Sequence, residues 1–313
     1  MANTYGKVSG TFQEIDNAYG KVSGTWQEAD EIYAKVSGVW QLVFAAFEAT
    51  SYSTLSSGSG TFTVPQGANA IHIQASVGGG GGAAGGVSYD KAGGESAGAG
   101  GGSGAYISDK VFTVTEGETI SYSIGGGGAP GNQTSNFGHP KTASAGTNTT
   151  LSGSSTGSLF TLGAGGGASG TGGGVQGPLR TNTAGTAGSA TINGSAITSG
   201  NFRDSDGSTK AVTTLTSGPV GTFNQSGNGV VGGNNGNCSG DNCQIGGSTG
   251  GASYAGNIAG GAGSPQGGST GGTAGTRGSG GGGGGAQYGT ESVTGLGAAG
   301  GNGEVKYRFL RVS

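Results

Sequence analysis

The stretch Val77-Gly78-Gly79-Gly80-Gly81-Gly82, in which an apolar strand runs directly into five glycines, decides the fold of this chain. Glycine accounts for 80 of the 313 residues. So much glycine normally produces a disordered chain, because glycine loses unusually large backbone freedom on folding and brings no apolar surface to bury. Here the runs alternate with varied stretches between well-patterned strands, so we expect a rigid glycine scaffold that carries loops. The other runs lie at residues 100–102, 125–128, 165–167, 172–174 and 280–285.

Strand patterns lie on both sides of the glycine-rich region. Residues 61–77 read as strand, turn and strand, with Ile71, Ile73, Ala75 and Val77 alternating with polar residues. A further pair of strands, 111–114 and 119–124, flanks a Glu-Gly-Glu turn, and the chain closes on the strand-like stretch 305–312. We expect these strands to pair with one another and the last to return beside the first. The glycine region is then an excursion from a small β base.

A glycine run that is held at both ends can form a left-handed threefold helix of the polyproline II type, which has no internal hydrogen bonds. Without Cβ atoms, such helices can lie side by side and satisfy one another's backbone groups. Each bond contributes about 0.5 to 1.5 kcal/mol, against an ordering cost of about 1 to 2 kcal/mol per residue. The array must therefore form cooperatively, with the β base as nucleus. The run 280–285 breaks the Gly-X-Y period that a collagen triple helix requires.

The first 49 residues contain a repeat with a period of fourteen, beginning at Tyr5, Tyr19 and Tyr33. A Ser-Gly pair between two β-prone runs favours a tight hairpin in each copy, with Lys21 opposite Trp26 and Tyr19 opposite Glu28. Helical turns after each aromatic residue are the alternative. Since isolated hairpins are marginally stable, we predict that the repeats dock on another chain and do not merely pack on themselves. The docking candidates are Tyr5, Phe12, Tyr19, Trp26, Tyr33 and Trp40.

The order of the motifs resembles the glycine-rich domains of bacteriophage tail-fibre proteins. The motifs are Thr-Phe-Thr-Val-Pro-Gln-Gly at 61–67, the strand ending in 78–82, Gly-Ala-Tyr at 104–106, Thr-Glu-Gly-Glu-Thr at 115–119 and the run 125–128. The resemblance covers residues 58–313. Within that group the chain is similar to the distal adhesins, in which polyglycine II helices pack as a sandwich and display loops. The Lys-Val-Ser-Gly-Thr-Trp repeat also resembles short repeats of phage tail proteins.

This resemblance implies a location and two partners. The location is the virion, at the tail or tail-fibre tip, after synthesis in the host cytoplasm. One partner is a receptor on the outer surface of the host, either a protein or a glycan. The other is a tail-fibre or baseplate protein, bound through the N-terminal repeats. The resemblance assigns no individual contact residue.

Candidate binding residues come from the loops between glycine runs, at 87–97, 129–162, 175–230, 234–245, 252–266 and 286–298. These loops combine aromatic residues with Asn, Ser and Thr, a composition typical of binding surfaces. An aromatic residue in such a loop either contacts a partner or is the only apolar group that fixes the base of the loop. The candidate receptor contacts are Tyr89, Phe137, Phe160, Phe202, Phe223, Tyr254 and Tyr288.

Composition argues against several other functions. Charged residues make up 9% of the chain, the net charge is -3, and no Lys or Arg run suits nucleic acid. No apolar stretch is long enough for membrane insertion, and the first residues lack the features of a signal peptide. The two histidines, His72 on the polar face of a strand and His139 in a loop, form no coherent catalytic set, so we expect no enzyme and no cofactor.

Two short motifs have structural interpretations. Asp204-Ser205-Asp206-Gly207-Ser208 resembles the start of a calcium loop, but its glycine is misplaced and the distal Glu is absent, so an Asp-Gly turn is favoured and no metal is expected. Cys238 and Cys243 flank Ser-Gly-Asp-Asn, a turn-forming sequence without neighbouring histidines. We predict a loop-closing disulfide there and not a zinc site.

The sequence therefore predicts a mainly β and irregular fold in four regions. These are a docking module of three repeats at 1–49, a β base with the first glycine runs at 50–125, a polyglycine II array with exposed loops at 126–302, and a closing strand at 303–313. The expected function is a phage tail or tail-fibre tip adhesin that binds a host receptor. The alternative is a structural virion protein, a tail spacer or decoration, without receptor binding. A secreted ice-binding or matrix protein is disfavoured, because the loops lack a regular repeat.

Overall fold

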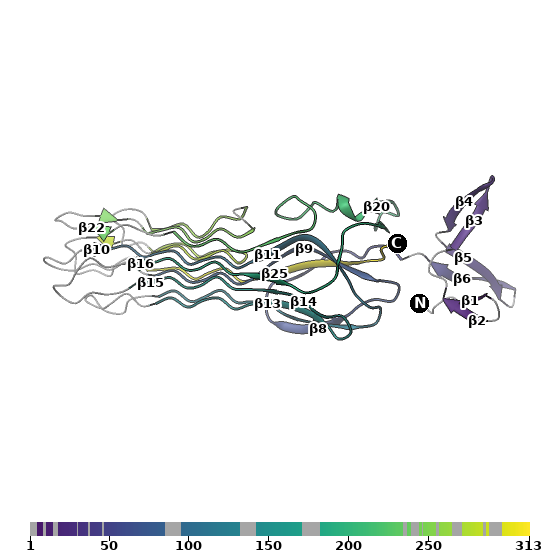
Figure 1. Ribbon diagram of the computed structural model, residues 1–313, viewed down its shortest axis with the longest axis horizontal. Coiled ribbons are helices and arrows are strands. Elements are labelled where there is room, and N and C mark those ends of the chain that lie inside the picture. Colours follow the sequence, from purple (N-terminus) through teal and green to yellow (C-terminus); the bar gives the residue numbers. More distant parts are fainter. Residues whose placement is uncertain are drawn as a thin grey trace.

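The chain forms an elongated molecule with N-terminal hairpins, a pair of β-sheets and a long array of extended glycine segments (Figure 1). The computed structural model describes residues 5–8, 11–14, 18–29, 31–36, 38–45, 47–84, 95–131, 142–170, 182–233, 237–238, 244–245, 247–254, 257–264, 271–283, 286–287 and 296–313. Strands and irregular segments dominate this part of the chain, which confirms the predicted fold class. The only helix among these residues is the single 3-10 turn η1 (Val212–Thr214).

Each N-terminal repeat forms one antiparallel hairpin, as the Ser-Gly turns predict. In the second hairpin Lys21 lies opposite Trp26 and Tyr19 opposite Glu28, which confirms the predicted register. Ser23 and Gly24 at its turn have φ of 51° and 86°, the backbone that twists the two strands together in a two-residue hairpin. The alternative of helical turns after the aromatic residues is wrong. The strands are β1 (Tyr5–Val8), β2 (Thr11–Glu14), β3 (Ala18–Val22), β4 (Thr25–Ala29), β5 (Glu31–Val36) and β6 (Val39–Ala45).

Two antiparallel sheets form the base of the glycine array. The first has the order β18-β11-β9-β25-β7, with β21 also paired to β11, and the second has the order β17-β14-β13-β12-β8. The first sheet comprises β7 (Ser53–Leu55), β9 (Ala70–Val77), β11 (Tyr106–Thr113), β18 (Ala196–Ile197), β21 (Gln225–Gly227) and β25 (Glu304–Leu310). The second comprises β8 (Ser59–Thr63), β12 (Thr119–Ser123), β13 (Thr149–Gly153), β14 (Gly157–Leu162) and β17 (Ala190–Ile192).

The C-terminal strand returns beside the first strands, as predicted. β25 lies between β9 and β7, with Phe309 opposite Ile71 and Val305 opposite Leu55. The strands that we expected to form local hairpins behave differently, because β8 and β9 belong to different sheets, as do β11 and β12. The turns between them therefore connect the two sheets, and a sandwich results in place of a meander.

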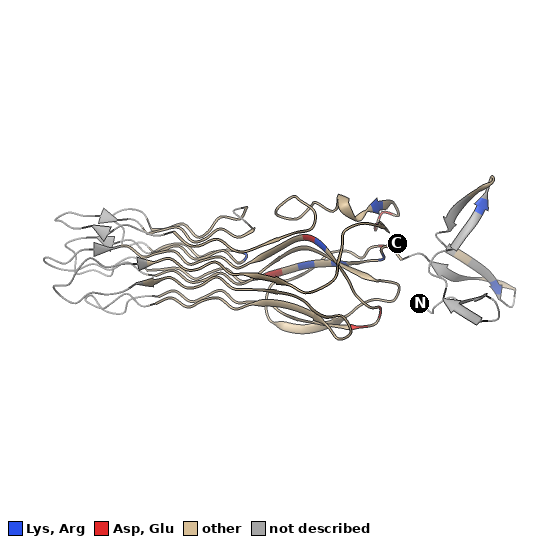
Figure 2. Cartoon of the chain, in the orientation of Figure 1, with Lys and Arg blue, Asp and Glu red and all other residues tan. Residues whose placement is uncertain are grey.

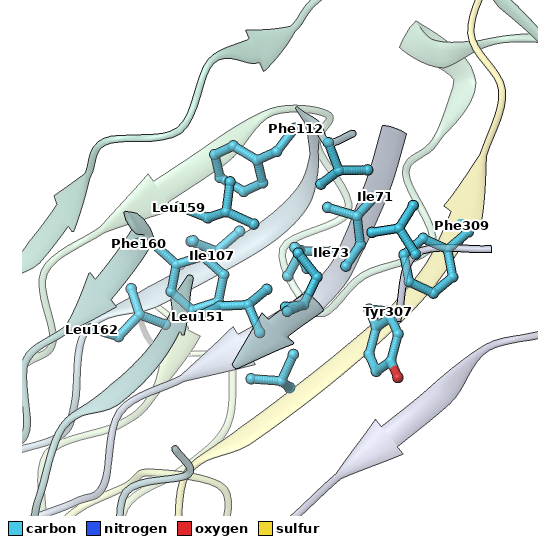
Figure 3. Close-up of a cluster of buried hydrophobic side chains, with 14 of the residues drawn as sticks. Ile71, Ile73, Ile107, Phe112, Leu151, Leu159, Phe160, Leu162, Tyr307 and Phe309 are labelled. Atoms are coloured by element: carbon cyan, nitrogen blue, oxygen red, sulfur yellow. The ribbon is translucent and has the colours of Figure 1, made fainter. Parts of the chain in front are cut away.

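The main hydrophobic core fills the space between the two sheets (Figure 3). Ile71, Ile73 and Phe112 come from the first sheet, and Leu151 and Phe160 come from the second. The Phe112 and Phe160 ring centroids lie 6.1 Å apart. Strand alternation places Ile71 and Ile73 of β9 and Leu151 of β13 in this core. The pairing of β9 skips Gln74, and Ala75 and Val77 pack in a separate cluster with Tyr106 and Tyr254.

The predicted domain boundaries need correction, because part of the region 126–302 belongs to the base. β13, β14 and β17 complete the second sheet, while β18 and β21 extend the first. β19 (Asn201–Arg203) and β20 (Thr209–Ala211) form a hairpin outside both sheets. These strands were missed because they are short and separated by glycines, so their alternation covers only a few residues each.

The glycine segments are extended, lie side by side and bond through their backbones. In the segment 78–84, the N–H groups of Gly78, Gly81 and Ala84 donate to one neighbour, 97–105. Those of Gly79 and Gly82 donate to a second neighbour, and those of Gly80 and Ala83 to a third. Three successive residues thus point in three directions, as expected for a helix with three residues per turn and no internal hydrogen bonds. The array predicted from the glycine runs is therefore present.

Three glycine segments, 78–84, 97–105 and 278–283, are buried throughout and form the interior of the array. Gly81 donates to Gly102, Gly101 to Gly281, and Gly281 to Gly81, so the three are mutual neighbours. In outer segments such as 163–168 only every third residue is buried, because one side of the threefold helix faces inward. The outer segments are 125–131, 142–148, 163–168, 184–189, 228–233, 247–252, 259–264, 271–276 and 296–303.

Candidate binding surface

The glycine segments alternate in direction, so their connections gather at two opposite ends of the array. For the first two segments, Gly78 bonds to Ala105 near the sheets, while Ala84 bonds to Ala99 far from them. Ala84 and Gly131 form a parallel bridge at the same far end. We call this end, opposite the sheets, the far end of the array (Figure 1). The connections that start and finish there comprise residues 85–96, 132–141, 169–183, 234–246, 265–270 and 284–295.

Short strand pairs link several of these connections at the far end. β10 (Glu95–Ser96) pairs with β22 (Asn237–Cys238), and β23 (Gln244–Ile245) pairs with β24 (Ala286–Gln287). β10 also contacts β24, and β22 contacts β23, so these strands form one group. β15 (Ser169–Gly170) and β16 (Asn182–Thr183) pair separately. Residues 95–96, 237–238, 244–245 and 286–287 are therefore held next to one another.

Some predicted site residues fall within these connections. Tyr89, Phe137 and Tyr288 belong to connections of the far end, but they lie outside the described residues. The predicted disulfide between Cys238 and Cys243 belongs to the connection 234–246. Cys243 and the side chain of Cys238 lie outside the described part of the chain.

Three predicted receptor contacts are buried aromatic residues, which corrects their assignment. Phe160 lies in the core between the sheets, and Phe202 is 2% exposed in a second cluster with Val212 and Leu310. Tyr254 is fully buried against Tyr106, with ring centroids 5.9 Å apart. These residues fix the base, because in a glycine-rich neighbourhood a large ring offers most of the available apolar area.

Phe223 and the segment around Tyr254 also belong to the base. Phe223 is half-buried and packs against the cluster that contains Phe202. Tyr254 lies at a turn in which Ser253 and Ile258 bond to each other, on the sheet side of the array. The stretch 252–266, predicted as one loop, is in fact a basal turn followed by the outer segment 259–264.

Serine and threonine hydroxyls accept hydrogen bonds from backbone N–H groups at the exposed edges between outer segments. The sequence pattern did not reveal this role. The N–H of Thr147 donates to the Gly126 carbonyl at 2.9 Å, while the Gly126 N–H donates to the Thr147 hydroxyl at 2.7 Å. Ser144 and Thr273 make the same paired bonds with Ala129 and Ala262. Each hydroxyl thus accepts a bond from an N–H at the surface, where no further segment lies.

The glycine segments carry no Lys, Arg, Asp or Glu, and the charged positions among the described residues lie in the base and the N-terminal hairpins (Figure 2), apart from Glu95 of β10 at the far end. The described bonds of the array come from backbone groups, Ser and Thr hydroxyls, and the side-chain amides of Asn148 and Asn302, which accept from Ala164 and Gly127.

Comparison with known families gives the chain its class. A family model described as a glycine-rich domain matches residues 54–310, which span both sheets and the whole array. The chain belongs to this family. The three N-terminal hairpins precede the matched part of this glycine-rich domain protein. A search of curated proteins gave no match. In the described residues of this glycine-rich domain protein no helix has the length and apolar character needed to cross a membrane.

The base of the glycine-rich domain contains a buried polar cluster. His72 was predicted on the polar face of a strand, and its side chain is buried there beneath Tyr52. Nδ1 of His72 lies 3.1 Å from the Tyr52 hydroxyl, and Nε2 lies 3.3 Å from Asp109 Oδ1. The Gly218 N–H donates to the second Asp109 oxygen at 2.7 Å. Burial lowers the pKa of His72, while its hydrogen bond with Asp109 opposes that shift.

A group of three charged residues, Asp204, Lys210 and Arg308, joins the hairpin β19–β20 to the first sheet. Arg308 of β25 donates to Asp204 at 2.6 Å, and Lys210 donates to the other Asp204 oxygen at 2.5 Å. Burial alone would raise the pKa of Asp204, but these bonds outweigh it and lower the pKa. Gly207 has φ of 79° and closes the predicted Asp-Gly turn. Within the described ranges, no group of three or more His, Cys, Asp and Glu could hold a metal ion.

Proposed function

We propose that the protein is a receptor-binding adhesin at the tip of a phage tail or tail fibre. The supporting observation is the polarity of the molecule, in which the N-terminal hairpins and the far end of the array, with β10 and β22, lie at opposite ends (Figure 1). One end is then available for attachment to the particle and the other for a receptor. The resemblance of the motif order to phage tail-fibre domains supports the same assignment.

The construction of the array also supports a display function. Adjacent glycine segments bond through backbone groups, as in the contacts of Gly81 with Gly102 and of Gly101 with Gly281. These bonds place no demand on the sequence of the connections, so the connections can change without loss of the scaffold. The connections contain aromatic, Asn and Ser residues, which suit recognition of a protein or glycan receptor on the host surface.

Exchange of the far-end connections tests the proposal. Replacing residues 132–141, which include Phe137, or residues 265–270 by Gly-Ser segments of equal length should remove or redirect binding of the purified protein to host cells. The thermal unfolding midpoint should stay within about 2 °C of the parent, because no bond between glycine segments is lost. Val231→Ser serves as the matched control, since it alters a side chain 60% exposed on the flank of the array and should leave binding intact.

Binding should fall less than about threefold between low and moderate salt, because the connections carry few charged residues, of both signs. If cells bind every exchanged variant as well as the parent, or if binding depends steeply on salt, the receptor is read elsewhere. In that case a tail spacer or decoration becomes the better assignment.

A further inference from the structure

The chain enters the base through residues 47–55, which we call the entry segment and which follow the last N-terminal hairpin. The end of this segment is β7, which pairs antiparallel with β25, with Ser53 opposite Tyr307. Just before β7, the N–H of Thr50 donates to the Phe309 carbonyl at 3.1 Å, and the Phe309 N–H donates to the Thr50 hydroxyl at 2.9 Å. The entry segment therefore lies along β25 from Thr50 to the end of β7.

Side-chain contacts also fix the entry segment, although β7 is an edge strand of the first sheet. Phe47 packs against the main core, and Ala49 is buried in the cluster that contains Phe202. The Arg308 guanidinium lies 4.7 Å from the centroid of the Tyr52 ring, which is a cation–π contact. The segment is therefore held along its whole length, and not only by the pairing of β7.

The direction of the two strands decides how they respond to tension along the molecule. β25 follows the outer segment 296–303 directly, and the Gly303 N–H donates to the Gly125 carbonyl at 2.7 Å, so the array holds the start of β25. The hairpins precede the entry segment and lie at the opposite end of the molecule from the far end of the array (Figure 1). A pull along the long axis therefore draws two antiparallel strands from their first residues in opposite directions. Because the bonds of an antiparallel ladder lie perpendicular to its strands, this pull loads all of them together.

A pull in another direction loads the same bonds differently. The C-terminus, Ser313, lies at the end of the base that faces the hairpins, because β25 runs from the array toward them (Figure 1). A pull between the first residue of the chain and Ser313 therefore parts the entry segment from β25 at one end, and the bonds break one at a time. The same pair of strands should resist axial tension more strongly than lateral tension.

We propose that the entry segment and β25 form a mechanical clamp that transmits tension between the N-terminal hairpins and the far end of the array. From β25 the load passes to β9, where Phe309 lies opposite Ile71, and then into the interior segment 78–84 that continues β9. The N–H of every residue in that segment donates to a neighbouring segment, so the load spreads over the array. The inference rests on the proposed function, because an adhesin held by a particle at one end and by a cell at the other is under tension.

Single-molecule force spectroscopy of the purified full chain tests the clamp. One handle is attached before Met1 in both arrangements. The second handle is inserted in the connection 265–270 for the axial pull or attached after Ser313 for the lateral pull. Forced unfolding follows the unfolding rate, so release of the base should need at least about twice the force in the axial pull at the same pulling speed. Equal forces, or a lower axial force, would overturn the proposal.

Two matched substitutions locate the resistance to the axial pull. Thr50→Val removes the side-chain acceptor of the Phe309 N–H, and Thr147→Val removes that of the Gly126 N–H at the edge of the array. Each variant loses one hydrogen bond, so their thermal unfolding midpoints should fall by similar amounts. Only Thr50→Val should lower the axial force, by about 10 to 30%, since one of several bonds that share the load is lost. A lower force for Thr147→Val alone, or an equal decrease in both variants, would contradict the clamp.

Cell binding in still medium separates this test from that of the adhesin function. The forces are measured without any cell or receptor, so they do not depend on receptor binding. Thr50→Val should bind cells as well as the parent, because no far-end connection changes. A parent protein that binds no cells would contradict the adhesin function, whereas the ratio of the axial to the lateral force decides the clamp.

Discussion

At the scale of single residues, the paired bonds of Thr147 with Gly126 show why hydroxyl residues accompany the glycines. Replacing Thr147 by Val keeps the branched shape but removes the acceptor for the Gly126 N–H. We expect a loss of about 1 kcal/mol in the free energy of unfolding, the usual contribution of one hydrogen bond. Thr147→Ser keeps the hydroxyl and should be less destabilising. Denaturant unfolding measures both variants, and equal stability of the two would show that the hydroxyl bond contributes nothing.

His72 makes the stability of the base depend on pH. Its pKa is lowered by burial, with the nearby Arg308 also lowering it and with Asp109 and Asp204 opposing the shift. The unfolded chain therefore takes up a proton first as the pH falls below about 6.5, and the folded state becomes less stable by up to about 1.4 kcal/mol per pH unit until the lowered pKa is reached. This contribution is fully present above pH 7. His72→Gln should flatten the dependence between pH 6.5 and 5, whereas His139→Gln, at the only other histidine, should leave it unchanged.

At the scale of elements, the glycines 78–82 of the interior segment have no room for a Cβ, whereas an outer segment has room at selected positions. A Cβ at Gly81 would overlap the Gly166 carbonyl, while a Cβ at Gly126 would lie 3.8 Å from its nearest neighbour, the Thr147 hydroxyl. Gly81→Ala should therefore destabilise the protein by about 1 to 3 kcal/mol or more. Gly126→Ala should be neutral or stabilising by about 0.5 kcal/mol, since it restricts the unfolded chain. Thermal unfolding compares them, and similar midpoints would contradict the packing.

At the scale of the whole molecule, the closing strand β25 lies inside the first sheet, whereas the described strands of the N-terminal hairpins pair with neither sheet of the base. Deleting residues 304–313 removes the strand between β9 and β7 and should abolish cooperative unfolding of the entire array, although no glycine segment is cut. Deleting residues 1–46 spares Phe47, which packs on the main core, and should leave the unfolding midpoint unchanged. Calorimetry and protease resistance distinguish the two truncations. A folded array without β25 would mean that the glycine segments assemble independently of the sheets.

The sequence by itself determined the local structures, because each depends on a short pattern. The Ser-Gly turns predicted the hairpin register of Lys21 with Trp26. The alternation in 71–77 predicted a strand with one buried face, and both faces of that strand are buried. The glycine runs predicted threefold helices, since no other residue lets backbones approach so closely. Only the tertiary structure decided which strands share a sheet, that residues 149–162 belong to the base, and that Phe160, Phe202 and Tyr254 face inward. Those outcomes depend on contacts between residues far apart in the chain, and a ring in a glycine-rich stretch has the same local signature whether it packs inside or faces a partner.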